Sequence, residues 1–153
     1  LQHLFQGMDL TDGAGNLSPL LLLANNLRAY AVTMLYGLIP FVRLPALALG
    51  VNAVLLGGLA ACYAATDTTM LLYAASLLPH GIFELPALIL AFSMGLYICG
   101  HLTRRCRRDP AALPLGACLG LAARLLVFLL LPLLILAALT EAYVTPLAAG
   151  LFL

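Results

Sequence analysis

The sequence predicts an all-α integral membrane protein. Hydrophobic residues make up 64% of its 153 residues and charged residues only 8%, more apolar surface than one soluble domain of this size buries in a single core. Several apolar runs are long enough to cross the roughly 30 Å hydrocarbon core of a bilayer as helices. We therefore expect a polytopic helical protein with about four transmembrane helices and one broken or re-entrant half-helix.

The chain divides into a short non-native start, a polar lead-in, one membrane domain and a tail. Residues 1–7 resemble the remnant of a cleavable expression tag, with Met8 as the native start. We assign residues 8–17 to the polar lead-in, 18–146 to a single helical membrane domain and 147–153 to a C-terminal tail.

The first predicted helix begins at Ser18-Pro19 and runs to about Ile39. Serine is a favoured N-cap residue, proline is favoured at the first helical position, and Pro40 ends the helix. Three polar residues lie in its early turns: Asn25, Asn26 and Arg28. An arginine in an apolar helix either points inward to a partner or extends to the membrane interface, and both remain open for Arg28.

The second predicted helix covers about residues 44–65. Small residues recur there at a spacing of four, Ala53, Gly57 and Ala61, which lets two helices approach closely in lipid and predicts a homo-oligomer. Asn52 lies in the same run, where it either bridges two helices through hydrogen bonds or belongs to a functional site.

The apolar stretch from 70 to 101 is too long for one straight span. The Pro79-His80-Gly81 sequence provides a break. We expect a half-helix over 69–78, a turn at Pro79–Gly81 and a full span over 82–102. Interrupted helices at membrane depth mark binding sites in transporters and channels.

The last apolar segment follows the polar loop Arg104–Pro114 and runs from about 115 to 142. It contains Arg124, is expected to bend at Pro132, reaches Glu141, and is expected to end at Pro146.

The arginine cluster of residues 104–108 predicts the orientation in the membrane. Arginines flanking an apolar helix favour the cytoplasmic side of the membrane. With residues 104–108 in the cytoplasm, Arg43 is also on the cytoplasmic side and both chain termini are outside the cell. The alternative for this cluster is specific binding of lipid or RNA. No other basic patch exists, so we expect no nucleic-acid partner.

Several polar residues fall inside the predicted spans: Asn25, Asn26, Arg28, Asn52, His80, Glu84, Arg124 and Glu141. On the predicted topology, Asn25, Asn26, His80, Glu84 and Glu141 all lie in the outer half of the membrane. Each needs a partner in so apolar an environment, so we expect these five residues to converge. His80 and Glu84, four residues apart, share one helix face.

Three functions fit such a cluster. It could be structural, with a buried His80–Glu84 pair satisfied by the asparagines. It could bind zinc through His80, Glu84 and Glu141, since histidine and carboxylates are zinc ligands. It could be an intramembrane hydrolase, with a glutamate such as Glu84 activating water. Because the chain has no HExxH motif and no serine beside a histidine, we favour the structural interpretation.

Three sequence blocks, in order, resemble the stage II sporulation protein M family. They are Asn25-Asn26-Leu27-Arg28 with Asn52 in the next helix, Leu78-Pro79-His80-Gly81-Ile82-Phe83-Glu84-Leu85-Pro86-Ala87, and Thr140-Glu141-Ala142-Tyr143-Val144-Thr145-Pro146. The second block is the most specific, and together the blocks span nearly all of residues 20–146.

The resemblance implies a multi-pass membrane protein. In spore formers the family is associated with a septal complex that contains two peptidoglycan-degrading partners and drives engulfment, and the family member there resembles a membrane scaffold. Relatives also occur in bacteria and archaea that do not sporulate. The alternatives to a scaffold are a membrane-embedded metal-dependent hydrolase and a small transporter subunit. Larger members carry a further apolar segment before the first block, and we expect no room for it after Met8.

Overall fold

The computed structural model describes residues 18–65 and 70–150, all of them helix or connecting turn. The helices are α2 (Pro19–Leu35), α3 (Leu44–Ala65), α4 (Met70–Cys106), α5 (Leu115–Leu125), α6 (Leu131–Leu139) and α7 (Thr145–Gly150). A 3₁₀ turn, η1 (Tyr36–Leu38), follows α2, and two π-helical segments, η2 (Leu126–Leu130) and η3 (Thr140–Val144), join α5, α6 and α7. The all-α prediction is confirmed. The predicted tag remnant, the lead-in and the last three residues of the tail lie outside the described residues.

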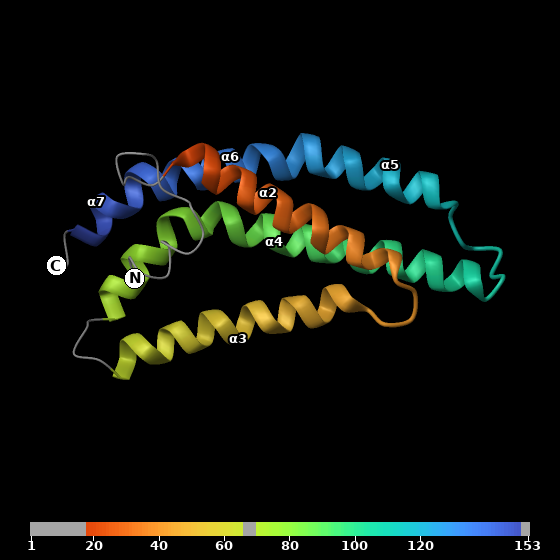
Figure 1. The fold of residues 1–153 in the computed structure, drawn as a ribbon, viewed down its shortest axis with the longest axis horizontal. Helices are drawn as coiled ribbons and strands as arrows, with labels where there is room; N and C mark the ends of the chain where they lie inside the picture. The colour runs from red at the N-terminus through yellow and green to blue at the C-terminus, as the bar shows by residue number, and fades with distance from the viewer. Residues whose placement is uncertain (1–17, 66–69, 151–153) are drawn as a thin grey trace.

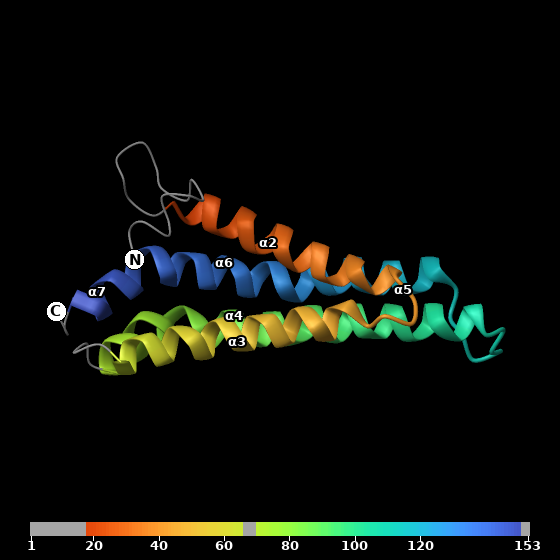
Figure 2. The same ribbon diagram turned by 60° about the horizontal axis from the view of Figure 1, so that its bottom comes forward.

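The core is built by three rods: α2, α4 and the α5–α7 rod. Figures 1 and 2 show α2 and the α5–α7 rod running side by side along α4, with α3 on the other side of α4. The buried side chains come from all three rods: Tyr30, Met34, Ala87, Ala91, Met94, Ile98, Cys118, Ala122, Leu130 and Leu134. Small alanines on α4 let the neighbouring helices approach closely.

Helix α3 lies outside this core. Pro45 is its one buried residue, and large apolar side chains such as Val54 and Leu55 stay mostly exposed. An apolar helix with so little buried surface is suited to lipid or to a partner helix. Its bounds match the prediction closely.

Helix α4 is continuous, which corrects the predicted break at Pro79–Gly81. It runs for 37 residues with Pro79 and Pro86 inside it, about 55 Å at 1.5 Å per residue. Figure 1 shows it changing direction in its first third. Proline lacks the N–H that continues the hydrogen-bond ladder, so a bend is its usual effect, and a helix can continue through it. The predicted half-helix and full span are therefore one bent helix.

The last rod also continues through its prolines. Each π-helical segment ends two residues before a proline, η2 before Pro132 and η3 before Pro146. The wider π-helical turn accommodates the proline ring and the hydrogen bond lost with the proline N–H, which explains why each π-helical segment precedes a proline. The prediction that Pro146 ends the helix is wrong, because α7 continues to Gly150.

Three helical stretches of the described chain are long and apolar enough to cross a membrane: Leu44–Ala65, Leu77–Cys106 and Leu115–Leu147. Helix α2, with 17 residues, is shorter than these stretches. Three of the four predicted spans are therefore supported by helix length and hydropathy. It begins at Pro19 as predicted, although the Ser18 side chain makes no capping hydrogen bond.

The α2–α3 turn lies against the end of α4. The backbone N–H of Phe41 donates to Thr103 Oγ1 at 3.0 Å, and the Arg107 guanidinium lies 5.9 Å from the centre of the Phe41 ring. Both turns that carry arginines, the one with Arg43 and the one after Arg105, therefore lie at the same end of the molecule (Figure 1).

A polar network inside the helical bundle

His80 and Glu84 form the centre of a polar network. They lie on α4 between its two prolines, and His80 Nε2 is 3.9 Å from Glu84 Oε2. The side chains are mostly enclosed, with exposed fractions of 12% for His80 and 29% for Glu84. The predicted shared helix face is confirmed.

Tyr30 connects α2 to this pair. Its hydroxyl lies 3.4 Å from Glu84 Oε1 and 3.3 Å from the Glu84 backbone carbonyl, both of them acceptors. The tyrosine is 3% exposed. A buried hydroxyl needs such an acceptor, because an unsatisfied one costs about 1–3 kcal/mol.

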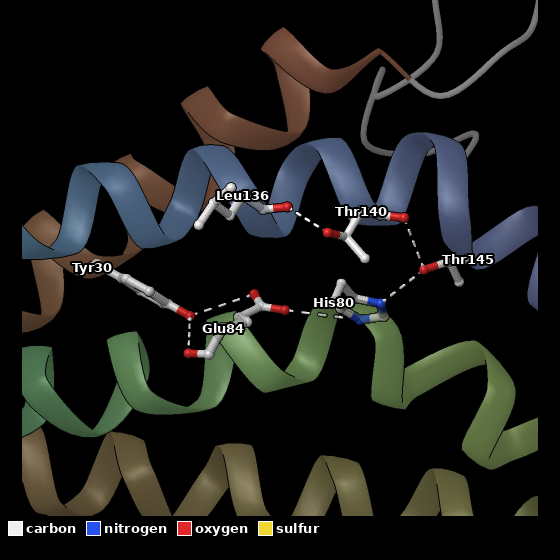
Figure 3. A network of polar contacts seen from close by, with 6 residues as sticks. All are labelled: Tyr30, His80, Glu84, Leu136, Thr140 and Thr145. Carbon is white, nitrogen blue, oxygen red and sulfur yellow. Dashed lines mark hydrogen bonds and ion pairs between the residues drawn. The ribbon is translucent and has the colours of Figure 1, made fainter.

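Thr140 and Thr145 connect the last rod to the pair (Figure 3). His80 Nδ1 is 3.3 Å from Thr145 Oγ1, and the Thr145 hydroxyl donates to the Thr140 carbonyl at 3.3 Å. The Thr140 hydroxyl donates to the Leu136 carbonyl at 2.7 Å. The contact from Thr145 to Thr140 spans five residues, the π-helical spacing of η3, so this segment places Thr145 opposite His80.

The Thr145 hydroxyl has a single proton to donate. When that proton is donated to the Thr140 carbonyl, Thr145 Oγ1 accepts from His80 Nδ1–H. The other ring nitrogen, Nε2, then faces Glu84 Oε2. Favourable contact between these two atoms requires one shared proton. The proton is either on His80, giving an imidazolium beside a carboxylate, or on Glu84, giving a neutral imidazole beside a carboxylic acid.

Glu141 lies close to the network without a hydrogen bond to it. It is half-buried in η3, and its carboxyl group is within electrostatic range of that of Glu84. Within residues 18–65 and 70–150, no three His, Cys, Asp or Glu side chains are grouped so that they could hold a metal ion. The zinc site predicted from His80, Glu84 and Glu141 therefore finds no support.

In the described part of the chain, the asparagines are not hydrogen-bonded to the pair. The amide of Asn52 donates to the Ala48 carbonyl one turn earlier in α3, and Asn52 lines a groove with Tyr36. Among the described residues, no hydrogen bond joins half-buried Asn25 or Asn26 to His80 or Glu84. Both arginines of the predicted polar set, Arg28 and Arg124, are exposed.

The network also contains residues that we did not predict as site residues: Tyr30, Thr140 and Thr145. Tyr30 is four residues after Asn26 and shares its helix face, but this spacing alone does not identify its partner. The two threonines belong to the third sequence block, in which we selected only Glu141.

A family model described as stage II sporulation protein M matches residues 8–146, most of the chain. The chain belongs to the stage II sporulation protein M family. Membership supports a sporulation-associated membrane protein, in agreement with the three apolar helices. No match was found among curated proteins or solved structures.

The network coincides with the sequence blocks of the family resemblance. His80 and Glu84 come from the second block, Thr140 and Thr145 come from the third, and Tyr30 is two residues after the first. Residues far apart in this family member thus meet in one largely half-buried cluster that joins α2, α4 and the α5–α7 rod.

Proposed function

We propose that this family member is a scaffold in the cell membrane that holds envelope proteins, including peptidoglycan-degrading enzymes, in one assembly. The contrast between the bundle and α3 supports the proposal. Three rods are fixed to one another by a buried core and a polar network, whereas α3 contributes a single buried residue, Pro45.

One face of α3 is built for contact with another helix. Small residues recur there with a heptad period: Ala46, Gly50, Ala53, Gly57, Ala60 and Ala64. We call this row the α3 stripe. A Cβ added to Gly50 or Gly57 would meet no atom within 4 Å, so no part of the described chain covers it there. Small residues at such a spacing let helices pack closely in lipid, where close packing drives association.

The polar network fits a structural role in this scaffold. Glu84 Oε1 has Tyr30 beside it and Oε2 has His80, so each carboxyl oxygen already has a neighbour from the protein. This arrangement stabilises the mutual positions of three helices, because buried polar groups that satisfy one another specify a single packing. A metal-dependent hydrolase and a transporter subunit have no comparable observation in their favour.

The orientation completes the proposal. The arginine cluster of residues 104–108, at the end of α4 and in the turn after it, faces the cytoplasm by the positive-inside rule. The polar network, at the opposite half of the bundle, then lies toward the outside, where peptidoglycan is remodelled.

Two adjacent glycines provide the test. Gly57 lies in the α3 stripe, while Gly58 is rotated by about 100° from it, and both face open space. Two differently tagged copies of the chain are expressed together in a bacterial host that has its own peptidoglycan-degrading enzymes. One copy is purified from solubilised membranes, and the amounts of the second copy and of those enzymes that co-purify with it are measured. Gly57→Leu is expected to reduce capture of the second copy and of those enzymes at least tenfold, and Gly58→Leu less than twofold. Equal capture by the two variants, or no capture by the unaltered chain, would refute the proposed contact face.

A further inference from the structure

The arginine-rich end of α4 carries a shallow pocket that the scaffold role does not use. It is lined by Tyr97, Gly100, His101 and Arg104 and has a volume of about 280 Å³. These positions lie within about a third of the helix circumference. Gly100 leaves the floor open, since a Cβ there would meet no atom within 4 Å.

His101 presents a hydrogen-bond donor at this pocket. The backbone N–H of Leu113 donates to His101 Nδ1 at 3.2 Å, so Nδ1 is an acceptor and the ring proton is on Nε2. The ring is held in place from the other side by Tyr97, with ring centres 4.5 Å apart in an edge-on arrangement. Within the described chain, no hydrogen bond uses Nε2.

Arg104 adds a positive charge. Its side chain is exposed, and none of the described residues forms an ion pair with it. Arg107, one turn later, is positioned over the Phe41 ring instead. A guanidinium beside an imidazole N–H offers several donors and a full charge on one helix face, a combination that suits phosphate oxygens.

The residues around the pocket favour a ligand with both a charged group and an apolar chain. The pocket lies at the end of an apolar span, at the level where tyrosine and arginine meet lipid headgroups. Toward the middle of the span, the same side of α4 exposes Tyr97 and then Ile89, which is 58% exposed. A ligand held by its phosphate at Arg104 therefore has an apolar surface beside it for a hydrocarbon chain.

We propose that this pocket binds the phosphate of an anionic phospholipid. Arg104 and His101 Nε2–H contact the phosphate oxygens, Gly100 makes room for the headgroup, and the acyl chain lies along Tyr97 and Ile89. The site is separate from the polar network, and its occupancy does not depend on the scaffold role.

Binding is measured on the full chain in detergent by native mass spectrometry, with titration of phosphatidylglycerol, phosphatidylcholine or inorganic phosphate. Arg104→Gln removes the charge at the pocket, and Arg105→Gln removes an equal charge on the next residue outside it. Gly100→Leu fills the floor and leaves the net charge unchanged. Thermal unfolding of each variant shows that it is folded.

The unaltered chain is expected to bind phosphatidylglycerol at least tenfold more tightly than phosphatidylcholine. Arg104→Gln and Gly100→Leu should each weaken that binding at least fivefold, and Arg105→Gln less than twofold. Equal losses in Arg104→Gln and Arg105→Gln with no effect of Gly100→Leu would indicate general charge attraction and overturn the proposal. Binding of inorganic phosphate as tightly as the lipid would overturn the assignment of a phospholipid.

Discussion

At the scale of single residues, Tyr30 provides the clearest test of the polar network. Tyr30→Phe keeps the buried ring and removes the hydroxyl that faces Glu84. Because this leaves a half-buried carboxyl oxygen without its donor, we expect a loss of about 1–3 kcal/mol in the free energy of unfolding in detergent.

The control variant, Tyr143→Phe, removes a tyrosine hydroxyl that is not hydrogen-bonded to a buried carboxyl group in the described chain. Tyr143 is 63% exposed, and Tyr143→Phe is expected to change the free energy of unfolding by less than about 0.5 kcal/mol, as surface substitutions usually do. If Tyr30→Phe proves as stable as Tyr143→Phe, the hydrogen bond from Tyr30 does not support the bundle.

Only part of the network was predictable residue by residue. His80 and Glu84 stand out because a charged or titratable side chain is costly in an apolar helix. Tyr30 and Thr145 do not, because tyrosine and threonine are common in apolar segments and the partner that each contacts is more than fifty residues away. The position of Thr145 also depends on the π-helical turn before it, which no spacing in the sequence reveals.

At the scale of elements, two glycines, Gly95 on α4 and Gly37 in η1, allow a close approach between elements. A Cβ added to Gly95 on α4 would lie 2.8 Å from Pro45 Cγ and 2.9 Å from the Thr33 carbonyl oxygen, and one added to Gly37 would meet the Gly95 carbonyl oxygen. Helices α2, α3 and α4 meet at this point, so larger residues there would force the elements apart.

Gly95→Ala is therefore expected to lower the free energy of unfolding by about 1–3 kcal/mol, the usual cost of overpacking. Gly120→Ala is the matched control, because it adds the same methyl group to a helix at a position with open space. The comparison is made by denaturant titration of both variants in the same detergent. A Gly95→Ala chain as stable as the control would contradict the close approach of these helices.

The helix boundaries show where sequence patterns succeed for elements and where they do not. Hydropathy located α3 and the last rod, because lipid requires long apolar helices. Proline was less informative: Pro40 follows the end of the first helix, whereas Pro79, Pro86, Pro132 and Pro146 all lie within helices. The difference depends on whether neighbouring helices pack against the bend, which is a property of the tertiary structure.

At the scale of the whole molecule, the membrane class and the all-α fold follow from composition. The arrangement of the helices does not: four apolar segments can pack in several ways, and the sequence alone does not reveal that α3 stays outside the core. The structure adds this asymmetry between a bundle of three packed rods and a helix with a single buried residue.

The proposed scaffold role requires that the helices cross the bilayer with the arginine-rich end in the cytoplasm. In a chain whose exposed Cys62 and Cys106 are replaced by serine, single cysteines are placed at Ala65, the end of α3, and at Asp109, in the turn after α4. A membrane-impermeant maleimide on intact cells is predicted to label Ala65→Cys, and to label Asp109→Cys only after permeabilisation. Labelling of both positions from the same side, or of Asp109→Cys alone on intact cells, would contradict this orientation.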